Sequence, residues 1–257
     1  MNTALQKEII EQYLPGLEVR VFETIDSTNT EARRIAGKEG IKPVLIAASS
    51  QSAGRGRMGR SFYSPENTGL YMTLLYPCKD ARNLLSVTSK TAVAVLKGIE
   101  AVKPDIHPEI KWVNDLYLNG RKICGILAES VLDPEEQTVK GVIVGIGINL
   151  STEDFPEDIR ETAGSLGDAS IDRNRLASSV TGFLLEELEN LEDRSYLELY
   201  RERSCVIGKE IVFIEDGLKK NACAESINDD AGLVVRLENG DLVTLSSGEI
   251  SVRVRKR

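Results

Sequence analysis

Residues 51–63 read QSAGRGRMGRSFY and hold three glycines and three arginines between Gly54 and Arg60. Such a segment has no apolar face to bury. Glycine lets the backbone approach a ligand closely and adopt a positive φ, and the planar guanidinium of arginine suits phosphate and carboxylate oxygens. Because the chain as a whole is acidic, this clustering favours an anion-binding loop over a solvated surface loop.

Two nucleotide-binding motifs match this loop by their letters alone. Its glycines spell G-x-G-x-x-G, and residues 54–61 resemble a P-loop with arginine in place of lysine. Both motifs require a helix directly after the glycines. Pro65 and Gly69 follow instead, without a helical period. We therefore reject both motifs and expect the loop to wrap around its anion.

Apolar segments flank the loop and set the fold class. Residues 44–48 (VLIAA) and 70–75 (LYMTLL) predict two buried strands. A loop between two core strands is well placed to act as a mobile lid over a site. Because it is so rich in glycine, we expect it to be open or disordered without a ligand.

The N-terminal third predicts a helix, a strand and a second helix. Apolar residues recur at helical spacing over residues 4–14, and residues 19–22 read as a strand. Thr28 and Glu31 form a capping box, so a helix is expected from Thr28 to Gly37 or Gly40. Taken alone, residues 26–29 (DSTN) are explained by that helix cap.

The middle of the chain predicts a helix over residues 82–102, one extended segment over 109–118 and a return strand over 121–129. Asn119-Gly120 between the last two is a strong type I′ hairpin signal. A two-residue hairpin pairs Leu118 with Arg121, Tyr117 with Lys122 and Asp115 with Cys124. Asp115 and Lys122 then lie on neighbouring strands but not opposite each other, and an exposed ion pair is the plain alternative.

Residues 139–149 predict a core strand in which Gly145 and Gly147 share one face. That face accommodates either a ligand or a tightly packed neighbour. An acidic loop over residues 151–170 precedes helices from Asp172 and over 196–203. Five short strands then predict a small antiparallel barrel. The sequence thus predicts an α+β fold with a mixed central sheet, divided into domains at 1–205 and 206–257.

Composition narrows the class of protein. The net charge of −8 argues against general nucleic-acid binding. The four cysteines are scattered without a C-x-x-C pair, which argues against a disulfide framework or zinc site and favours the reducing cytoplasm. Neither a signal peptide nor a membrane-spanning run is present in the sequence. His107, the only histidine, precedes Pro108 and is interpreted as structural.

Six short segments are informative as an ordered set. They are residues 26–29 (DSTN), 54–60 (GRGRMGR), 111–116 (KWVNDL), 122–129 (KICGILAE), 145–149 (GIGIN) and 248–253 (GEISVR). Each alone is a weak signal, but together they resemble the signature segments of the biotin protein ligases, also called biotin–[acetyl-CoA-carboxylase] ligases. The resemblance covers nearly the whole chain. It implies a class II synthetase-like catalytic domain followed by an SH3-like β-barrel.

The chain departs from the family pattern at two positions. Met58 stands where the family has another arginine, and Val113 replaces a proline, which leaves the turn before Asn114 undefined. The bifunctional members carry an N-terminal helix-turn-helix domain. About eighteen residues precede the first predicted strand, so the resemblance implies a monofunctional ligase that does not bind DNA.

The resemblance implies protein biotinylation in two steps. Biotin reacts with ATP to give biotinyl-5′-AMP and pyrophosphate, and a lysine of a biotin carboxyl carrier domain then takes the biotinyl group. Preorganised cations stabilise the charge that develops, so Lys122 and Arg57 are the expected catalytic cations, with Arg55 on the biotin carboxylate. Asp115 is the third catalytic candidate and orients Lys122, the incoming lysine or a Mg²⁺ ion; the metal ligands stay undefined.

The resemblance also implies two sets of binding residues. The biotin set is Ser27, Thr28, Asn29, Gln51, Gly54, Arg55, Gly56, Arg57, Lys122, Gly125, Leu127 and Gly145. The ATP and adenylate set is Arg57, Arg60, Phe62, Lys111, Asn114, Asp115, Lys122, Asn149 and Arg253. Phe62 is assigned to adenine stacking, with a place in the core as the alternative.

Two other functions fit parts of the same pattern. A lipoate-protein ligase shares the fold and the adenylation chemistry, and a non-catalytic biotin or nucleotide sensor would bind without labelling a carrier. Some relatives pair two subunits through edge strands, so a homodimer is open. The sequence does not name the acceptor carboxylase.

Overall fold

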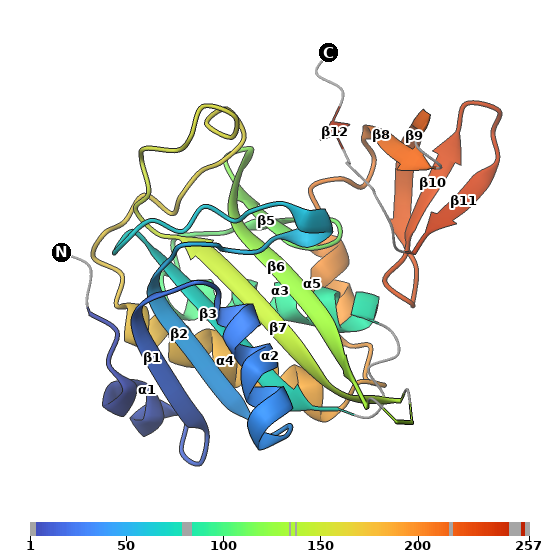
Figure 1. The fold of residues 1–257 in the computed structure, drawn as a ribbon. Coiled ribbons are helices and arrows are strands. Elements are labelled where there is room, and N and C mark those ends of the chain that lie inside the picture. The colour runs from blue at the N-terminus through green and yellow to red at the C-terminus, as the bar shows by residue number, and fades with distance from the viewer. Residues whose placement is uncertain are drawn as a thin grey trace.

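The computed structural model describes residues 4–78, 84–133, 135–136, 138–215, 218–246 and 253–254. Within these residues the chain forms a seven-stranded sheet in the order β1-β2-β3-β7-β6-β5-β4 and a five-stranded sheet in the order β11-β10-β9-β8-β12. The large sheet is covered by helices, and the small sheet lies at one end of the molecule (Figure 1). The predicted α+β fold is confirmed.

The large sheet is mixed. Its strands are β1 (Glu18–Ile25), β2 (Val44–Gln51), β3 (Gly69–Pro77), β4 (Glu109–Lys111), β5 (Asp115–Leu118), β6 (Arg121–Leu132) and β7 (Val139–Asn149). β1 and β2 are parallel, and every other neighbouring pair is antiparallel. Parallel neighbours need a crossover connection, which α2 provides between β1 and β2.

Helices cover both faces of this sheet. They are α1 (Lys7–Tyr13), α2 (Thr28–Glu39), α3 (Leu84–Val102), α4 (Arg173–Glu189) and α5 (Tyr196–Glu202). β2 shows how two cores arise, because Leu45 belongs to the large core and its neighbours Val44 and Ile46 to the small core under α2. Successive strand residues point to opposite faces, so an unbroken apolar run is buried on both sides.

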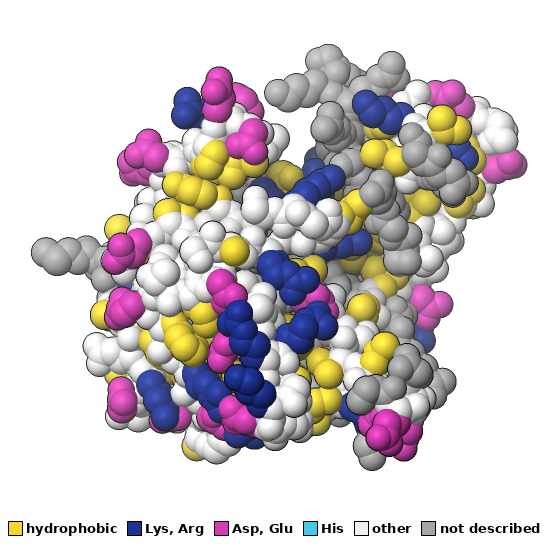
Figure 2. Space-filling model, in the orientation of Figure 1, with side chains coloured by type: hydrophobic (Ala, Val, Ile, Leu, Met, Phe, Trp, Pro, Cys, Tyr) yellow, Lys and Arg dark blue, Asp and Glu magenta, His cyan; other side chains and the backbone are white. Residues whose placement is uncertain are grey.

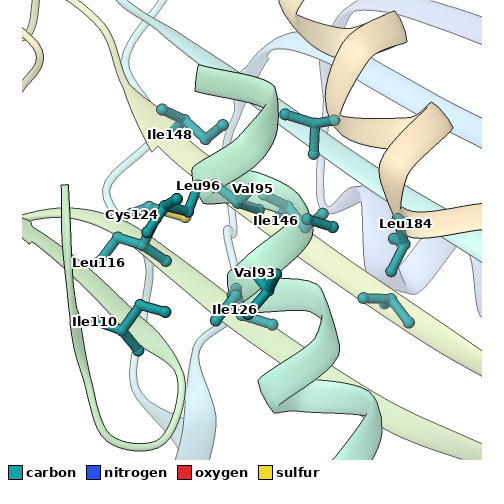
Figure 3. Close-up of a cluster of buried hydrophobic side chains, with 14 of the residues drawn as sticks. Val93, Val95, Leu96, Ile110, Leu116, Cys124, Ile126, Ile146, Ile148 and Leu184 are labelled. Atoms are coloured by element: carbon teal, nitrogen blue, oxygen red, sulfur yellow. The ribbon is translucent and has the colours of Figure 1, made fainter. Parts of the chain in front are cut away.

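The larger core lies between the sheet and the pair α3 and α4. Figure 3 shows Val93 and Leu96 of α3 against Ile126 and Ile146 of the sheet, and all four are almost completely buried. Among the described helices, none is long and apolar enough to cross a membrane.

The predicted start of α2 at Thr28 is confirmed, but the cap differs. The residue before the helix is Ser27, and Ser27 makes no side-chain capping bond. Thr28 lies in the first turn, and both its backbone N–H and its hydroxyl donate to Gln51 Oε1 at 2.9 and 3.1 Å. The predicted capping box is therefore wrong, because a residue of β2 takes the hydroxyl. The predicted end is confirmed: Gly40 follows the helix with φ of 82°.

The predicted extended segment over 109–118 is two strands. β4 and β5 are antiparallel and joined by a tight turn at residues 112–114, with a cis peptide between Trp112 and Val113. The hairpin after β5 pairs Leu118 with Arg121 and Tyr117 with Lys122, as predicted.

The third predicted pair of that hairpin is wrong. A bulge lies beyond Tyr117, so Asp115 faces Gly125 and not Cys124. A bulge inserts one extra residue on one strand, and the residues beyond it consequently change face. Cys124 is completely buried in the large core, while Lys122 and Gly125 come to share the opposite face.

The small sheet contains β8 (Glu210–Glu215), β9 (Leu218–Ile227), β10 (Leu233–Leu237), β11 (Leu242–Leu245) and β12 (Arg253–Val254). Trp112 Nε1 donates to Ala231 O at 2.8 Å, and Arg201 Nε donates to Ile227 O at 2.8 Å. These bonds tie the small sheet to the turn after β4 and to α5. Residues 248–252 of the sixth signature segment lie outside the described residues.

Candidate active site

The loop over residues 51–63 folds back on itself. Phe62 N donates to Gly54 O at 2.9 Å, Gly56 N donates to Arg60 O at 2.7 Å, and Arg55 and Ser61 form an antiparallel bridge. The only helical turn is a three-residue 3₁₀ turn at Arg57–Gly59, so the rejection of both nucleotide motifs stands. The structure has this loop closed over the sheet on the side of α2 (Figure 1), and its opening without a ligand stays a prediction.

Glycine at position 54 serves the loop itself. A Cβ atom there would lie 2.3 Å from Phe62 O and 2.8 Å from Ser64 Oγ. Real Cβ contacts are not this short, so any side chain would separate the two arms of the loop. Gly54 is the one member of the predicted biotin set that does not line the cavity described next.

A cavity lies between the loop, α2 and the glycines of β6 and β7. The predicted biotin set lines it with Ser27, Thr28, Asn29, Gln51, Arg55, Gly56, Arg57, Lys122, Gly125, Leu127 and Gly145. Residues separated by more than a hundred positions in the chain are thus brought to one cavity.

The inner end of this cavity carries a buried polar network. Thr73 Oγ1 donates to Asn29 Oδ1 at 2.7 Å and lies 2.8 Å from Thr28 Oγ1. Gln51 accepts from Thr28 through Oε1 and donates from Nε2 to Ser64 Oγ at 2.8 Å. The sequence prediction missed Thr73, although a lone threonine in the apolar strand LYMTLL was a usable signal.

The glycines of β6 and β7 make room for two side chains of the protein. A Cβ on Gly145 would lie 2.0 Å from Asn29 Oδ1, and one on Gly147 would lie 2.4 Å from the ring of Phe62. Gly125, opposite Gly147, lies under the same ring. Tight packing against Asn29 and Phe62 is thus what these glycines allow, and contact with a ligand stays a prediction.

Four polar side chains form a chain of contacts at the outer end. Lys122 Nζ lies 2.7 Å from Asp115 Oδ1, which accepts from Asn114 Nδ2 at 2.9 Å. Arg57 Nη1 donates to Asn114 Oδ1 at 3.0 Å. The Lys122 ammonium passes over Gly125, where a Cβ would lie only 3.2 Å from it. The bulge and the absence of a side chain at Gly125 together allow the contact between Lys122 and Asp115, which the simple hairpin register did not predict.

Glu129 forms a second charged cluster at the mouth of the cavity. Its carboxylate accepts from Arg55 at 3.0 and 3.2 Å, from Arg33 at 2.7 Å and from Asn29 at 3.0 Å. Basic and acidic side chains lie side by side on this face (Figure 2). Arg55 thus already has a carboxylate partner, and Glu129 was missed as a site residue because only its place in the fourth signature segment marked it.

A second cavity lies beyond Phe62 and Lys122, which line both cavities. Its walls are mostly aromatic and polar, namely Ser61, Phe62, Tyr63, Tyr117, Lys122, Asn149, Phe155, Ile159, Thr162 and Ala163. Asn149 is buried, and its Nδ2 donates to Gly164 O at 2.9 Å. Within the described part of the chain, its buried Oδ1 has no hydrogen-bond partner.

Other members of the predicted ATP set lie elsewhere. Arg60 is exposed and lines neither cavity. Lys111 Nζ lies 3.1 Å from the hydroxyl of Tyr117, whose pKa burial raises. Arg253 belongs to β12, but its side chain lies outside the described part of the structure.

The residues described here do not form a site for a resident metal ion. No group of three or more His, Cys, Asp or Glu side chains within the described ranges is arranged to hold one. Asp115, the predicted candidate, is held by Lys122 and Asn114. One engaged carboxylate does not match the ligand sets of resident magnesium or zinc.

Comparison with known proteins identifies the family. A model described as the biotin/lipoate A/B protein ligase family matches residues 21–149, about half of the chain. The chain belongs to this family. The prediction made from the six segments is thereby confirmed at the level of the family.

Individual relatives agree with this family. A bifunctional ligase/repressor BirA of Bacillus spizizenii is 38% identical over 184 residues, which are 70% of this chain and 54% of that protein. A biotin–[acetyl-CoA-carboxylase] ligase of Mycobacterium tuberculosis is 32% identical over 91% of this chain and 88% of its own length. The chain therefore spans about half the length of the first of these family members and most of the second.

A solved structure of the family has the same fold. The biotin protein ligase of Aquifex aeolicus in complex with biotin and ATP superposes with a TM-score of 0.77 at 26% identity. The match covers 93% of this chain and 99% of that chain. It includes both sheets in outline, because so little of either chain is left out.

Proposed function

We propose that this chain is an ATP-dependent biotin–[acetyl-CoA-carboxylase] ligase that makes biotinyl-5′-AMP and transfers biotin to a lysine of a carrier domain. One observation carries the proposal: the cavity lined by the predicted biotin set meets the aromatic cavity at Lys122 and Phe62. A carboxylate extending from the first cavity and a nucleotide in the second would meet beside the Lys122 ammonium. The ligands named for the Aquifex aeolicus enzyme, biotin and ATP, support the same division.

In the first step, a biotin carboxylate oxygen bonds to the α-phosphorus of ATP while the bond to the pyrophosphate oxygen breaks. Lys122, held 2.7 Å from Asp115, is placed to neutralise charge shared between carboxylate and phosphate. Arg57 reaches the same place through its bond to Asn114. Preorganised cations of this kind are worth roughly 10²–10³ in rate per group.

In the second step, the ε-amino group of the acceptor lysine attacks the carbonyl carbon of the mixed anhydride, and AMP leaves. The lysine ammonium must lose one proton to solvent to become a nucleophile, and its nitrogen passes a second proton to solvent as the neutral amide forms. Asp115 is the carboxylate beside the proposed reaction centre, so we assign it the role of orienting Lys122 and attracting the incoming ammonium. Arg55 would have to exchange Glu129 for a substrate carboxylate in order to act on biotin directly.

The inner polar network suits the ureido ring of biotin, which both donates and accepts hydrogen bonds. Thr28, Gln51 and Asn29 supply a hydroxyl and two amides at that end of the cavity. Such mixed groups fix the orientation of a ligand in an otherwise apolar pocket. The remaining wall, from Gly125 to Leu127 and at Gly145, would contact the apolar part of biotin.

The aromatic cavity suits adenine. Phe62 and Tyr63 line it, and the ring of Phe155 lies 6.3 Å from that of Tyr63. Asn149 Oδ1 is the buried acceptor there, and adenine presents an exocyclic amino donor where guanine presents a carbonyl. We therefore assign Asn149 to the adenine amino group. Magnesium is expected to arrive with the phosphates of ATP as part of the substrate.

Other parts of the proposal depend on the sequence pattern and the family resemblance. The acceptor is a biotin carboxyl carrier domain, and the setting is the cytoplasm. Domains at 1–205 and 206–257, an SH3-like barrel, an absence of DNA binding and a possible homodimer remain predictions.

Pyrophosphate exchange tests the proposal directly. The protein is incubated with ATP, Mg²⁺ and either biotin or lipoate, followed by transfer to a biotin carboxyl carrier domain. We expect exchange with biotin and labelling of the carrier lysine. Exchange with lipoate alone would indicate a lipoate ligase, and tight biotin binding without carrier labelling would indicate a sensor.

A further inference from the structure

Lys122 lies where the central sheet loses its regular pairing. β6 pairs with β7 only from Cys124 onward, because Cys124 faces Ile148 and β7 ends one residue later. On its other side Lys122 faces Tyr117 of β5. The backbone of Lys122 would therefore lack a neighbour on the β7 side if the sheet alone supported it.

Residues 162–164, in the loop after β7, take that place. Lys122 N donates to Thr162 O at 2.8 Å, and Gly164 N donates to Lys122 O at 2.8 Å, so Ala163 forms a parallel bridge with Lys122. Ala163 and Gly164 are both buried. Both backbone groups of Lys122 are thus held by residues 162–164.

The same piece is tied to the wall of the aromatic cavity. Asn149 Nδ2 donates to Gly164 O, and Leu166 N donates to Asn149 O at 3.0 Å. Thr162 and Ala163 line that cavity themselves. Residues 162–164 consequently connect the surface assigned to the nucleotide with the backbone of the lysine.

Gly164 is the residue in this piece whose size matters. A Cβ there would lie 2.7 Å from Arg121 Cβ. That atom is fixed to the backbone directly before Lys122, so a flexible side chain cannot relieve the contact. The φ of Gly164 is outside the left-handed region, so only this contact, and not the backbone conformation, opposes a larger residue.

We infer that Gly164 is a positioning residue for Lys122: its missing side chain lets residues 162–164 pair closely enough to hold the lysine in register. This inference rests on the proposed function for its kinetic consequence, but the pairing itself is independent of it. Gly164→Ala should separate the piece from Arg121 and shift Lys122. Misplacement on the order of 1 Å costs roughly 10²-fold in rate.

The kinetic test compares Gly164→Ala with Gly37→Ala, whose Cβ would meet nothing within 4 Å. We expect Gly164→Ala to lower kcat for biotin-dependent pyrophosphate release at least about tenfold, with a nearly unchanged Kd for biotin. Gly37→Ala should stay within about twofold. Wild-type kcat in Gly164→Ala would overturn the inference.

A rescue variant separates positioning from general damage. Arg121→Gly removes the Cβ that the new methyl group would meet, so Gly164→Ala with Arg121→Gly should recover the kcat of Arg121→Gly alone. If Gly164→Ala folds poorly, recovery of folding and kcat in the double variant identifies the contact with Arg121 Cβ as the cause. A double variant whose kcat is no higher than that of Gly164→Ala alone would contradict the inference.

Amide hydrogen exchange tests the pairing without any turnover. In Gly164→Ala the Lys122 amide should exchange faster, while the amide of Ile126, which donates to Asn114 O, should be unchanged. Equal protection of Lys122 in both proteins would overturn the inference. If the wild type releases no pyrophosphate with biotin, the proposed function fails, whereas the exchange experiment still decides the role of Gly164.

Discussion

Lys122 lines both cavities, as Phe62 does, and its ammonium lies 2.7 Å from Asp115. Its chemical role was predicted from the fourth signature segment. Its position was not, since the bulge in β6 and the open space over Gly125 decide where the ammonium goes.

Lys122→Ala should reduce biotin-dependent pyrophosphate exchange by roughly 10²–10³-fold, because it removes the cation placed between carboxylate and phosphate. The pair with Asp115 is partly exposed, with the lysine side chain 32% accessible. Its loss should therefore cost no more than about 1 kcal/mol of stability. Lys140→Ala, which removes an exposed ion pair with Glu136, is the matched control, and near-normal turnover of Lys122→Ala would refute the role.

Gly145→Ala tests the wall of the first cavity. The new methyl group would overlap Asn29 Oδ1 at 2.0 Å and displace the amide from Thr73 and Glu129. Asn29 lines the cavity, and losing one hydrogen bond to the ligand, worth about 0.5–1.5 kcal/mol, would weaken the Kd for biotin roughly 2- to 13-fold. Isothermal titration calorimetry measures this Kd.

The control for that variant is Gly182→Ala. Its Cβ would approach only Leu14 Cδ2, at 3.9 Å, so biotin binding should stay as in the wild type. An unchanged Kd for Gly145→Ala would show that Asn29 does not shape the ligand site.

At the scale of elements, periodicity predicted the strands and helices well, and local irregularities were missed. β2, β3, β7 and α4 lie where apolar spacing put them. The division into β4 and β5 was missed because residues 109–118 contain no glycine or proline to mark a turn. The cap of α2 was misassigned because the Thr28 hydroxyl donates to Gln51, a residue of β2.

The end of α2 is joined to β1 by charged contacts. Arg20 donates to Glu39 at 2.9 and 2.7 Å, and Lys42 lies 3.0 Å from the same carboxylate. Hydrogen bonding from Arg20, followed by that from Lys42, lowers the pKa of Glu39 to about 2. A group with a lowered folded-state pKa stabilises the protein above its unfolded pKa, and that contribution disappears as pH falls through the folded value.

Glu39→Gln should therefore flatten the fall of Tm between about pH 4.5 and pH 2, because the neutral amide has no charge to lose there. Thermal unfolding followed by circular dichroism over that range measures the slope. Glu8→Gln, at an exposed glutamate of α1, is the control and should fall like the wild type. An identical slope for Glu39→Gln would contradict the prediction.

At the scale of the whole molecule, the C-terminal sheet contacts the turn at residues 112–114, which leads into Asp115. Trp112 is nearly buried and donates to Ala231 O, and the hydroxyl of Tyr200 donates to Val113 O at 3.1 Å. Asn114 and Asp115 directly follow these two residues in the chain. The sequence does not reveal the Trp112 bond, because its partner is 119 positions away.

Trp112→Phe should lower both stability and turnover, since the phenyl ring fills most of the space but leaves Ala231 O without its donor. Removing one partner of a buried hydrogen bond costs about 1–3 kcal/mol, measurable by urea unfolding. The turn carrying Asn114 would lose one of its anchors, so kcat for pyrophosphate exchange should fall while Kd for biotin stays constant. Tyr13→Phe, at an exposed tyrosine, controls for aromatic substitution, and a Trp112→Phe protein that loses stability but keeps full kcat would show that the two sheets are joined for folding alone.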